Sequence, residues 1–161
     1  MSDIQNAFRL IGSLDLTSLS HDDTEEKIAA LCAKAVTPYG TTAAVCVYPE
    51  WVPLARKLLK KTPVKVATVV NFPAGGNDFK LMKDEIKKGL SGGADEIDAV
   101  FPYRDFLAGN TDSCRRFLDI IQRECGKHTS KIILETGELN HVSTIAAAVK
   151  LCLEYDIDFI K

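Results

Sequence analysis

Apolar and polar positions follow two periods along this chain, and segments of the two periods alternate. Short apolar runs of strand length are followed by longer segments whose apolar residues recur every three or four positions. The predicted strands are 10–17, 41–49, 64–72, 94–104, 131–136 and 157–161. The predicted helices are 20–35, 51–61, 79–90, 114–125 and 142–152. Strands that alternate with helices through short loops predict a parallel sheet.

Two α/β architectures fit this pattern, a doubly wound open sheet and a (β/α)8 barrel. The barrel is favoured because the strands end in polar residues and no glycine-rich phosphate fingerprint follows the first strand. A barrel of this kind has about 250 residues. The sequence has 161 residues and ends on its sixth predicted strand. We therefore expect 1–161 to be the N-terminal part of a single TIM-barrel domain, an incomplete (β/α)8 barrel of about five βα units plus strand six.

The predicted strand 94–104, ADEIDAVFPYR, carries a charge in its middle. Side chains of a strand alternate between its faces, so Ile97, Ala99 and Phe101 share one face and Asp98 points to the other. A strand apolar enough to be covered on both faces encloses Asp98 as well. Burying a carboxylate costs several kcal/mol or shifts its pKa unless a partner compensates the charge. A partner for Asp98 is therefore expected.

Lys161, at the end of the sixth predicted strand, is the candidate partner. Side chains from alternate strands of a barrel share layers, so strands four and six can bring Asp98 and Lys161 together. Desolvation lowers the pKa of a lysine, which can then form a Schiff base with a carbonyl while a neighbouring acid moves protons. A structural Asp–Lys ion pair fits the same spacing equally well. The residues alone leave both readings open.

Several motifs, in the same order along the chain, resemble the deoxyribose-phosphate aldolase family. They are SLDLTSL at 13–19, TTAAVCVYP at 41–49, NFP at 71–73, GADEIDAVFPYR at 93–104, ETGEL at 135–139 and DFIK at 158–161. The resemblance covers essentially the whole chain. It implies a (β/α)8 class I aldolase that cleaves 2-deoxy-D-ribose 5-phosphate to D-glyceraldehyde 3-phosphate and acetaldehyde without a metal or other cofactor.

The resemblance also implies roles for individual residues. Lys161 of DFIK would be the Schiff-base lysine and Asp98 of EIDAVFP the proton-relay acid. The substrate pocket would be lined by Asp15, Thr17, Cys46 and Phe72. The family's second relay lysine on strand seven and its phosphate-binding loops on strands seven and eight have no counterpart in 1–161, so we expect weak activity or none from this chain.

A non-catalytic alternative follows from the incomplete barrel. In this alternative the chain is a self-associating module without catalytic activity. Exposed sheet edges favour pairing with another chain, which predicts a homodimer or higher homo-oligomer; exchange of a segment between the chains is one way to form it. Another alternative, an open-sheet phosphate-binding or signalling domain, leaves the sixth strand and DFIK unexplained.

Charge and composition bear on the possible binding partners and on the compartment of the protein. Lys and Arg total 20 against 22 Asp and Glu, a net charge of -2, which gives no electrostatic argument for nucleic acid or an acidic membrane. The segment MSDIQNAFRLIG lacks the pattern of a secretion signal, and no apolar run has the length of a membrane helix. Five widely spaced cysteines fit reduced thiols. Together these features predict a cytoplasmic protein. The three histidines, His21, His128 and His141, lack metal-ligand spacing, so no metal site is expected.

Overall fold

The chain folds into two compact units in the computed structural model, which describes residues 3–161. Met1 and Ser2, which begin the segment compared above with a secretion signal, lie outside the described residues. The first unit comprises the described residues up to Thr68 together with Gly89–Asp95. The second comprises Val69–Lys88 and Glu96–Lys161.

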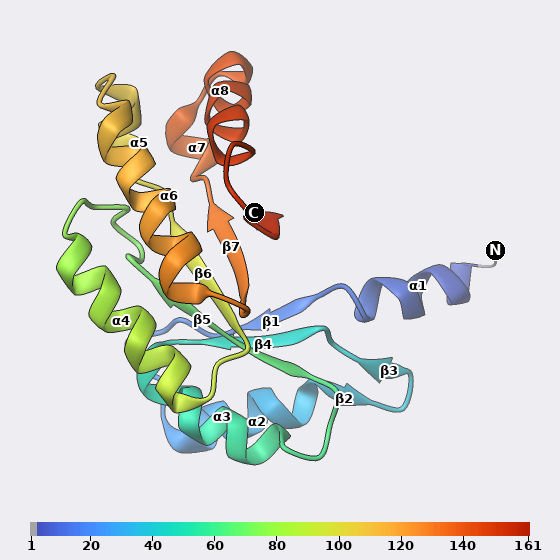
Figure 1. Cartoon of the computed structure of the whole chain (residues 1–161). Helices are drawn as coiled ribbons and strands as arrows, with labels where there is room; N and C mark the ends of the chain where they lie inside the picture. The colour runs from blue at the N-terminus through green and yellow to red at the C-terminus, as the bar shows by residue number, and fades with distance from the viewer. Residues whose placement is uncertain (1–2) are drawn as a thin grey trace. The chain divides into compact units, whose positions relative to one another are not determined.

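The first unit contains three parallel strands and the helices between them. Its strands are β1 (Asp15–Thr17), β4 (Ala44–Val47) and most of β5 (Lys65–Val70), and its helices are α1 (Asp3–Ile11), α2 (Glu25–Lys34), η1 (Pro49–Trp51, a 3-10 helix) and α3 (Val52–Leu59). A two-stranded antiparallel hairpin, β2 (Val36–Thr37) with β3 (Gly40–Thr41), separates α2 from β4. Helices α2 and α3 lie side by side in this unit (Figure 1).

The second unit repeats the strand-helix alternation. It contains most of α4 (Phe79–Gly92), then β6 (Glu96–Val100), α5 (Tyr103–Leu107), α6 (Thr111–Cys125), β7 (Thr129–Ile133), α7 (Thr136–Leu139), α8 (Val142–Cys152) and β8 (Phe159–Ile160). Strands β6, β7 and β8 pair in parallel in chain order. Helix α6 packs beside β7, and α7 and α8 follow that strand (Figure 1).

The order of the strands distinguishes the two architectures that the sequence allowed. Hydrogen-bonded neighbours run β1-β4-β5-β6-β7-β8, which is their order along the chain. In a doubly wound sheet the strand order reverses at a switch point, whereas in a (β/α)8 barrel each strand lies next to its predecessor. The predicted fold class, an incomplete TIM barrel of five βα units plus strand six, is confirmed.

The first predicted strand, 10–17, is wrong over its N-terminal part. Residues up to Ile11 belong to helix α1, and only Asp15–Thr17 form a strand. Asp3 in the first turn and Arg9 in the last turn favour a helix, because each charge opposes the nearby end of the helix dipole. Beyond Gly12, the Ser13 hydroxyl donates to the Leu10 carbonyl at 2.9 Å and satisfies an acceptor of the last turn.

The second predicted strand, 41–49, is shorter than expected. Gly40 and Thr41 form an antiparallel pair with Val36–Thr37, and the parallel strand β4 begins only at Ala44. The boundaries of a strand depend on which segment it pairs with, and that pairing is not encoded in the run of β-branched residues alone.

The strand on which the charged residue was predicted has the expected two faces. Ile97, Ala99 and Phe101 are fully buried, as the alternation predicted. Asp98 on the other face is also 0% exposed. Both faces of β6 are therefore enclosed, which confirms that Asp98 is a buried carboxylate.

The turn after β5 approaches the end of β6 so closely that only glycine fits at one position. Gly75 has φ +57, and a Cβ there would lie 2.5 Å from the Phe101 carbonyl oxygen and 2.9 Å from the Tyr103 ring. The Asn71 side chain holds this turn, because its amide donates to the carbonyls of Gly76 and Val100, each at 2.9 Å.

We expect Gly75→Ala to lower the free energy of unfolding by about 3 kcal/mol, the sum of left-handed backbone strain and overpacking. Gly109→Ala is the matched control, because Gly109 has φ +80 but nothing within 4 Å of an added Cβ. The control should lose only about 1 kcal/mol. Urea unfolding followed by circular dichroism measures both, and equal losses would show that the close approach has no energetic effect.

Candidate active site

Parallel pairing of β6, β7 and β8 brings the predicted catalytic residues together. Lys161 directly follows β8, where its backbone N–H donates to the Ile132 carbonyl at 2.8 Å and its carbonyl accepts from the Leu134 N–H at 3.1 Å. These bonds to β7 and the residue after it hold the Lys161 backbone in register. The side chain then extends toward β6.

Lys161 and Asp98 form a direct ion pair. The Lys161 ammonium donates to Asp98 Oδ2, with Nζ and Oδ2 2.7 Å apart. The Asp98 side chain is 0% exposed, whereas that of Lys161 is 40% exposed. The predicted approach of the two residues is therefore present. The arrangement places a buried acid in contact with a partly exposed amine.

A second lysine lies against the same carboxylate. Lys131 is the register partner of Asp98 on β7, and its side chain is only 9% exposed. Its Nζ lies 2.6 Å from Oε2 of Glu96, and 3.8 Å from Oδ1 of Asp98. The lysine therefore leans back along the strand toward Glu96.

The sequence reading did not select Lys131 or Glu96 as site residues. One signal was available for each. Lys131 begins the predicted buried strand 131–136, where a charge is unusual, and Glu96 shares a strand face with Asp98. Neither signal says which acid pairs with which lysine, because that depends on the register between β6 and β7.

Three of the residues predicted to line a substrate pocket lie in the first unit. Asp15 and Thr17 are on β1, and Cys46 is on β4. Thr17 and Cys46 are register partners, whereas Asp15 lies opposite Ala44. The Cys46 side chain is buried, and Thr17 is exposed with its hydroxyl donating to the Asp15 carbonyl at 3.1 Å. Their contact with substrate stays a prediction.

Phe72, the fourth predicted pocket residue, lies in the second unit. It is half-buried and follows Asn71, which has φ 56 and whose side chain ties the turn to the end of β6. The Asn71 backbone N–H also donates to Oε2 of Glu85 on α4 at 2.7 Å. Asn71 therefore fixes the chain direction at Phe72, a role the sequence reading did not assign.

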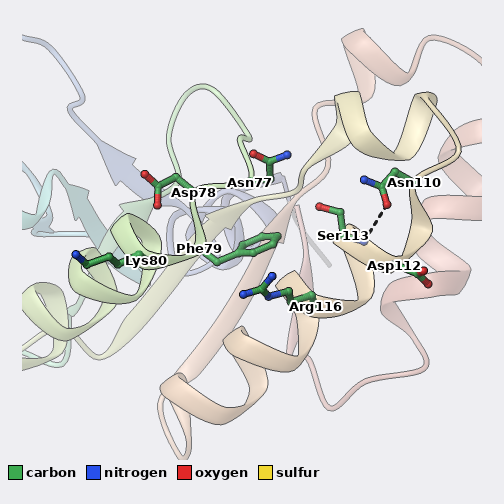
Figure 2. A pocket seen from close by; sticks show the side chains of 8 residues that line it. All are labelled: Asn77, Asp78, Phe79, Lys80, Asn110, Asp112, Ser113 and Arg116. Carbon is green, nitrogen blue, oxygen red and sulfur yellow. Dashed lines mark hydrogen bonds between the residues drawn. The ribbon is translucent and has the colours of Figure 1, made fainter.

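A separate pocket opens between the N-termini of α4 and α6. It is lined by Asn77, Asp78, Phe79, Lys80, Asn110, Asp112, Ser113 and Arg116 (Figure 2). The Arg116 guanidinium lies 5.1 Å from the centre of the Phe79 ring, and the Asn110 side chain accepts from the Ser113 N–H. Two acidic and two basic side chains balance each other, and none of the sequence-predicted site residues lies in this pocket.

Comparison with known proteins agrees with the strand order. The model of the DeoC/LacD family of aldolases matches residues 9–161. The chain belongs to the DeoC/LacD aldolase family. The resemblance that the motifs carried is thereby confirmed over nearly the whole sequence.

Solved structures of aldolases share this fold. A Coccidioides immitis protein assigned to the deoxyribose-phosphate aldolases is 29% identical, with a TM-score of 0.89 over 95% of this chain and 59% of its own. One from Toxoplasma gondii ME49 is 28% identical, with a TM-score of 0.85 over 97% of this chain and 60% of its own. An aldolase named QR15 is 30% identical, with a TM-score of 0.86 over 99% of this chain and 67% of its own.

The DeoC/LacD-family chain thus spans about three fifths of the first two solved relatives. Residues 3–161 contain no group of three or more His, Cys, Asp or Glu side chains that could hold a metal ion. No helix in that described range has the length and hydrophobicity to cross a membrane.

The five cysteines of this aldolase-family chain are free thiols in buried positions. Burial raises the pKa of Cys114 to about 11 and that of Cys125 and Cys152 to about 12. It also raises the pKa of Cys32. A raised pKa leaves less thiolate at a given pH, and thiolate is the form that attacks. These four side chains are packing groups.

We expect the native chain to react with fewer than about one equivalent of Ellman's reagent in the first minutes at about pH 8. Unfolding in guanidinium should expose all five thiols. The absorbance of the released thiolate measures both. Rapid reaction of two or more thiols in the native chain would contradict the buried placement.

Proposed function

We propose that this chain carries the Schiff-base lysine and proton-relay acid of a class I aldolase that cleaves 2-deoxy-D-ribose 5-phosphate. The products would be D-glyceraldehyde 3-phosphate and acetaldehyde. The observation that carries the proposal is the 2.7 Å contact between Lys161 Nζ and Asp98 Oδ2, a partly exposed amine on a fully buried acid. Membership of the aldolase family supports it.

Formation of the imine requires Lys161 to lose a proton, because only the neutral amine has the electron pair that attacks a carbonyl carbon. Asp98 Oδ2 is placed to accept that proton. The amine adds to the aldehyde carbon of the open-chain sugar, and the carbinolamine loses water when its hydroxyl receives a proton. Asp98 would return the proton at this step.

Carbon–carbon cleavage would use the protonated imine as an electron sink. A base removes the proton of the C3 hydroxyl, the C2–C3 bond breaks, and its electron pair forms an enamine with Lys161. D-Glyceraldehyde 3-phosphate leaves as the aldehyde. Protonation of the enamine carbon and hydrolysis by water then release acetaldehyde and the free lysine.

The substrate-contacting residues of this proposal come from strand ends. Thr17 ends β1 and Phe72 follows β5, whereas Asp15 begins β1 and Cys46 lies one residue before the end of β4. The carboxyl ends of parallel strands are where barrel enzymes bind substrate. The phosphosugar and the aldehyde are therefore the proposed small-molecule partners. A non-catalytic self-associating module is not favoured by the comparisons, which find aldolases.

Acetaldehyde with sodium borohydride should reduce an imine at Lys161 and leave an ethyl group there. We expect peptide mass spectrometry to find Lys161 modified at least about tenfold more than the exposed lysines Lys57 and Lys60. Asp98→Asn should lower the Lys161 adduct at least about tenfold, because the relay acid is lost.

The exposed Asp119 on α6 provides a matched control, since Asp119→Asn makes the same chemical change away from the pair. It should leave the adduct at Lys161 unchanged. Equal labelling of Lys161 and the surface lysines in the native chain would mean that the pair is a structural ion pair only.

Self-association through a sheet edge is the second part of the proposal. Strand β8 is last in the strand order, and its two residues are exposed, Phe159 by 57% and Ile160 by 37%. Apolar side chains on an edge strand favour pairing with another chain. An Aeropyrum pernix deoxyribose phosphate aldolase, 24% identical, is described as tetrameric.

Light scattering after size-exclusion chromatography should give a homo-oligomer at micromolar concentration. Phe159→Lys should shift it toward the monomer, because a charge on the edge opposes strand pairing. Leu153→Lys is the control, since Leu153 is 72% exposed but follows α8. A wild-type monomer, or equal effects of the two variants, would contradict association through β8.

A further inference from the structure

Two charged groups beside the candidate acid take no part in the steps above. Glu96 and Lys131 have side chains only 14% and 9% exposed, and the proposed steps assign a role to neither. Ionised groups are rarely buried to this extent unless they compensate each other. Their burial next to Asp98 therefore calls for an explanation in terms of that residue.

The register of β6 and β7 makes the pairing selective. Glu96 and Asp98 are two apart on β6 and share a face, with Thr129 and Lys131 as their respective register partners. Lys131 thus sits opposite Asp98, but its Nζ lies 2.6 Å from Glu96 Oε2 and 3.8 Å from Asp98 Oδ1. The side chain turns away from its register partner to the neighbouring acid.

The four charges consequently divide into two pairs. Lys131 is compensated by Glu96, and Asp98 Oδ2 is left for Lys161 at 2.7 Å. Without the charge of Glu96, the buried Lys131 ammonium would draw on Asp98. Asp98 would then be a weaker proton acceptor, because a nearby cation stabilises the carboxylate form.

We propose that Glu96 is a positioning residue that acts through Lys131, neutralising that lysine so that Asp98 serves as the proton partner of Lys161. This rests on the proposed aldolase reaction for its purpose, but the charge pairing itself can be measured without any substrate.

The other groups around the cluster do not replace Glu96. Asp158, next to β8, accepts from the Ser130 N–H at 2.8 Å and from the Ser130 hydroxyl at 3.3 Å. The Phe159 ring, whose centre lies 6.0 Å from Lys131 Nζ, carries no charge. Among the described side chains, Lys131 on β7 lies 3.8 Å from Asp98 Oδ1, and Glu96 on β6 lies 2.6 Å from Lys131 Nζ.

The test measures the apparent pKa of Lys161 by an NMR titration of lysines labelled with carbon-13 at Cε. The Lys161→Arg variant, which lacks one of these signals, assigns the signal of Lys161. Glu96→Gln leaves Lys131 uncompensated, so the pKa of Lys161 should fall by about one pH unit. Lys131→Met leaves Glu96 uncompensated, so the pKa of Lys161 should rise by a similar amount. Glu50→Gln, on an exposed residue of η1, should change nothing.

Shifts of opposite sign in the pKa of Lys161 distinguish charge pairing from a general loss of structure. If Glu96 and Lys131 only filled space, both variants would move Lys161 in the same direction, toward the value of a free lysine, and the proposal would be overturned. It would also be overturned if neither variant moved the titration of Lys161.

A double variant covers the case in which either single variant fails to fold. Glu96→Gln with Lys131→Gln removes both charges at once, and the titration of Lys161 should stay within a few tenths of a pH unit of the wild type. A larger shift would contradict the pairing. Failure of acetaldehyde trapping at Lys161 with these titrations intact would reject the aldolase chemistry and leave the charge pairing standing.

Discussion

The buried carboxylate of Asp98 is the constraint on which the second unit depends. An isolated charge in a protein interior costs several kcal/mol, and β6 offers no compensation of its own because its other central residues are apolar. The compensating charge in direct contact comes from Lys161, the residue after β8, while the Lys131 ammonium of β7 lies 3.8 Å from Asp98 Oδ1. The burial of Asp98 therefore depends on the pairing of β6, β7 and β8.

This arrangement gives the two members of the pair different environments. Asp98 is fully enclosed, whereas the Lys161 side chain is 40% exposed. In the proposed reaction Asp98 would exchange a proton with its contact partner Lys161, and the partly exposed amine would attack the aldehyde. A purely structural ion pair would not require that asymmetry, which is one reason why we propose aldolase chemistry for this member of the family.

Packing around the turn after β5 supports the same region. Asn71 spans from its own turn to the end of β6, and Gly75 lets the backbone approach Phe101. These contacts, together with the bond from the Asn71 N–H to the Glu85 carboxylate, hold the turn that carries Phe72. Four of the buried cysteines contribute as small apolar groups with little reactive thiolate, because burial raises their pKa values: Cys32, Cys114, Cys125 and Cys152.

Much of this could be predicted from the order of residues alone. The two hydrophobic periods located most helices and strands, and the alternation in 94–104 showed that Asp98 must be buried, because both signals are local. The motifs, which occur in the same order as in the aldolase family, pointed to that family. Helix α1 escaped this reading because the apolar residues before Asp15 suit a strand as well as a helix.

The tertiary structure decided the rest. That Lys161 reaches Asp98, that Lys131 turns to Glu96, and that β3 pairs back on β2 all depend on which strands lie next to each other and in what register. Registers are set by the summed packing of both strands and not by either segment alone. The sequence therefore determined that Asp98 places a charge in the core, and only the assembled sheet determined which charged side chains lie against it.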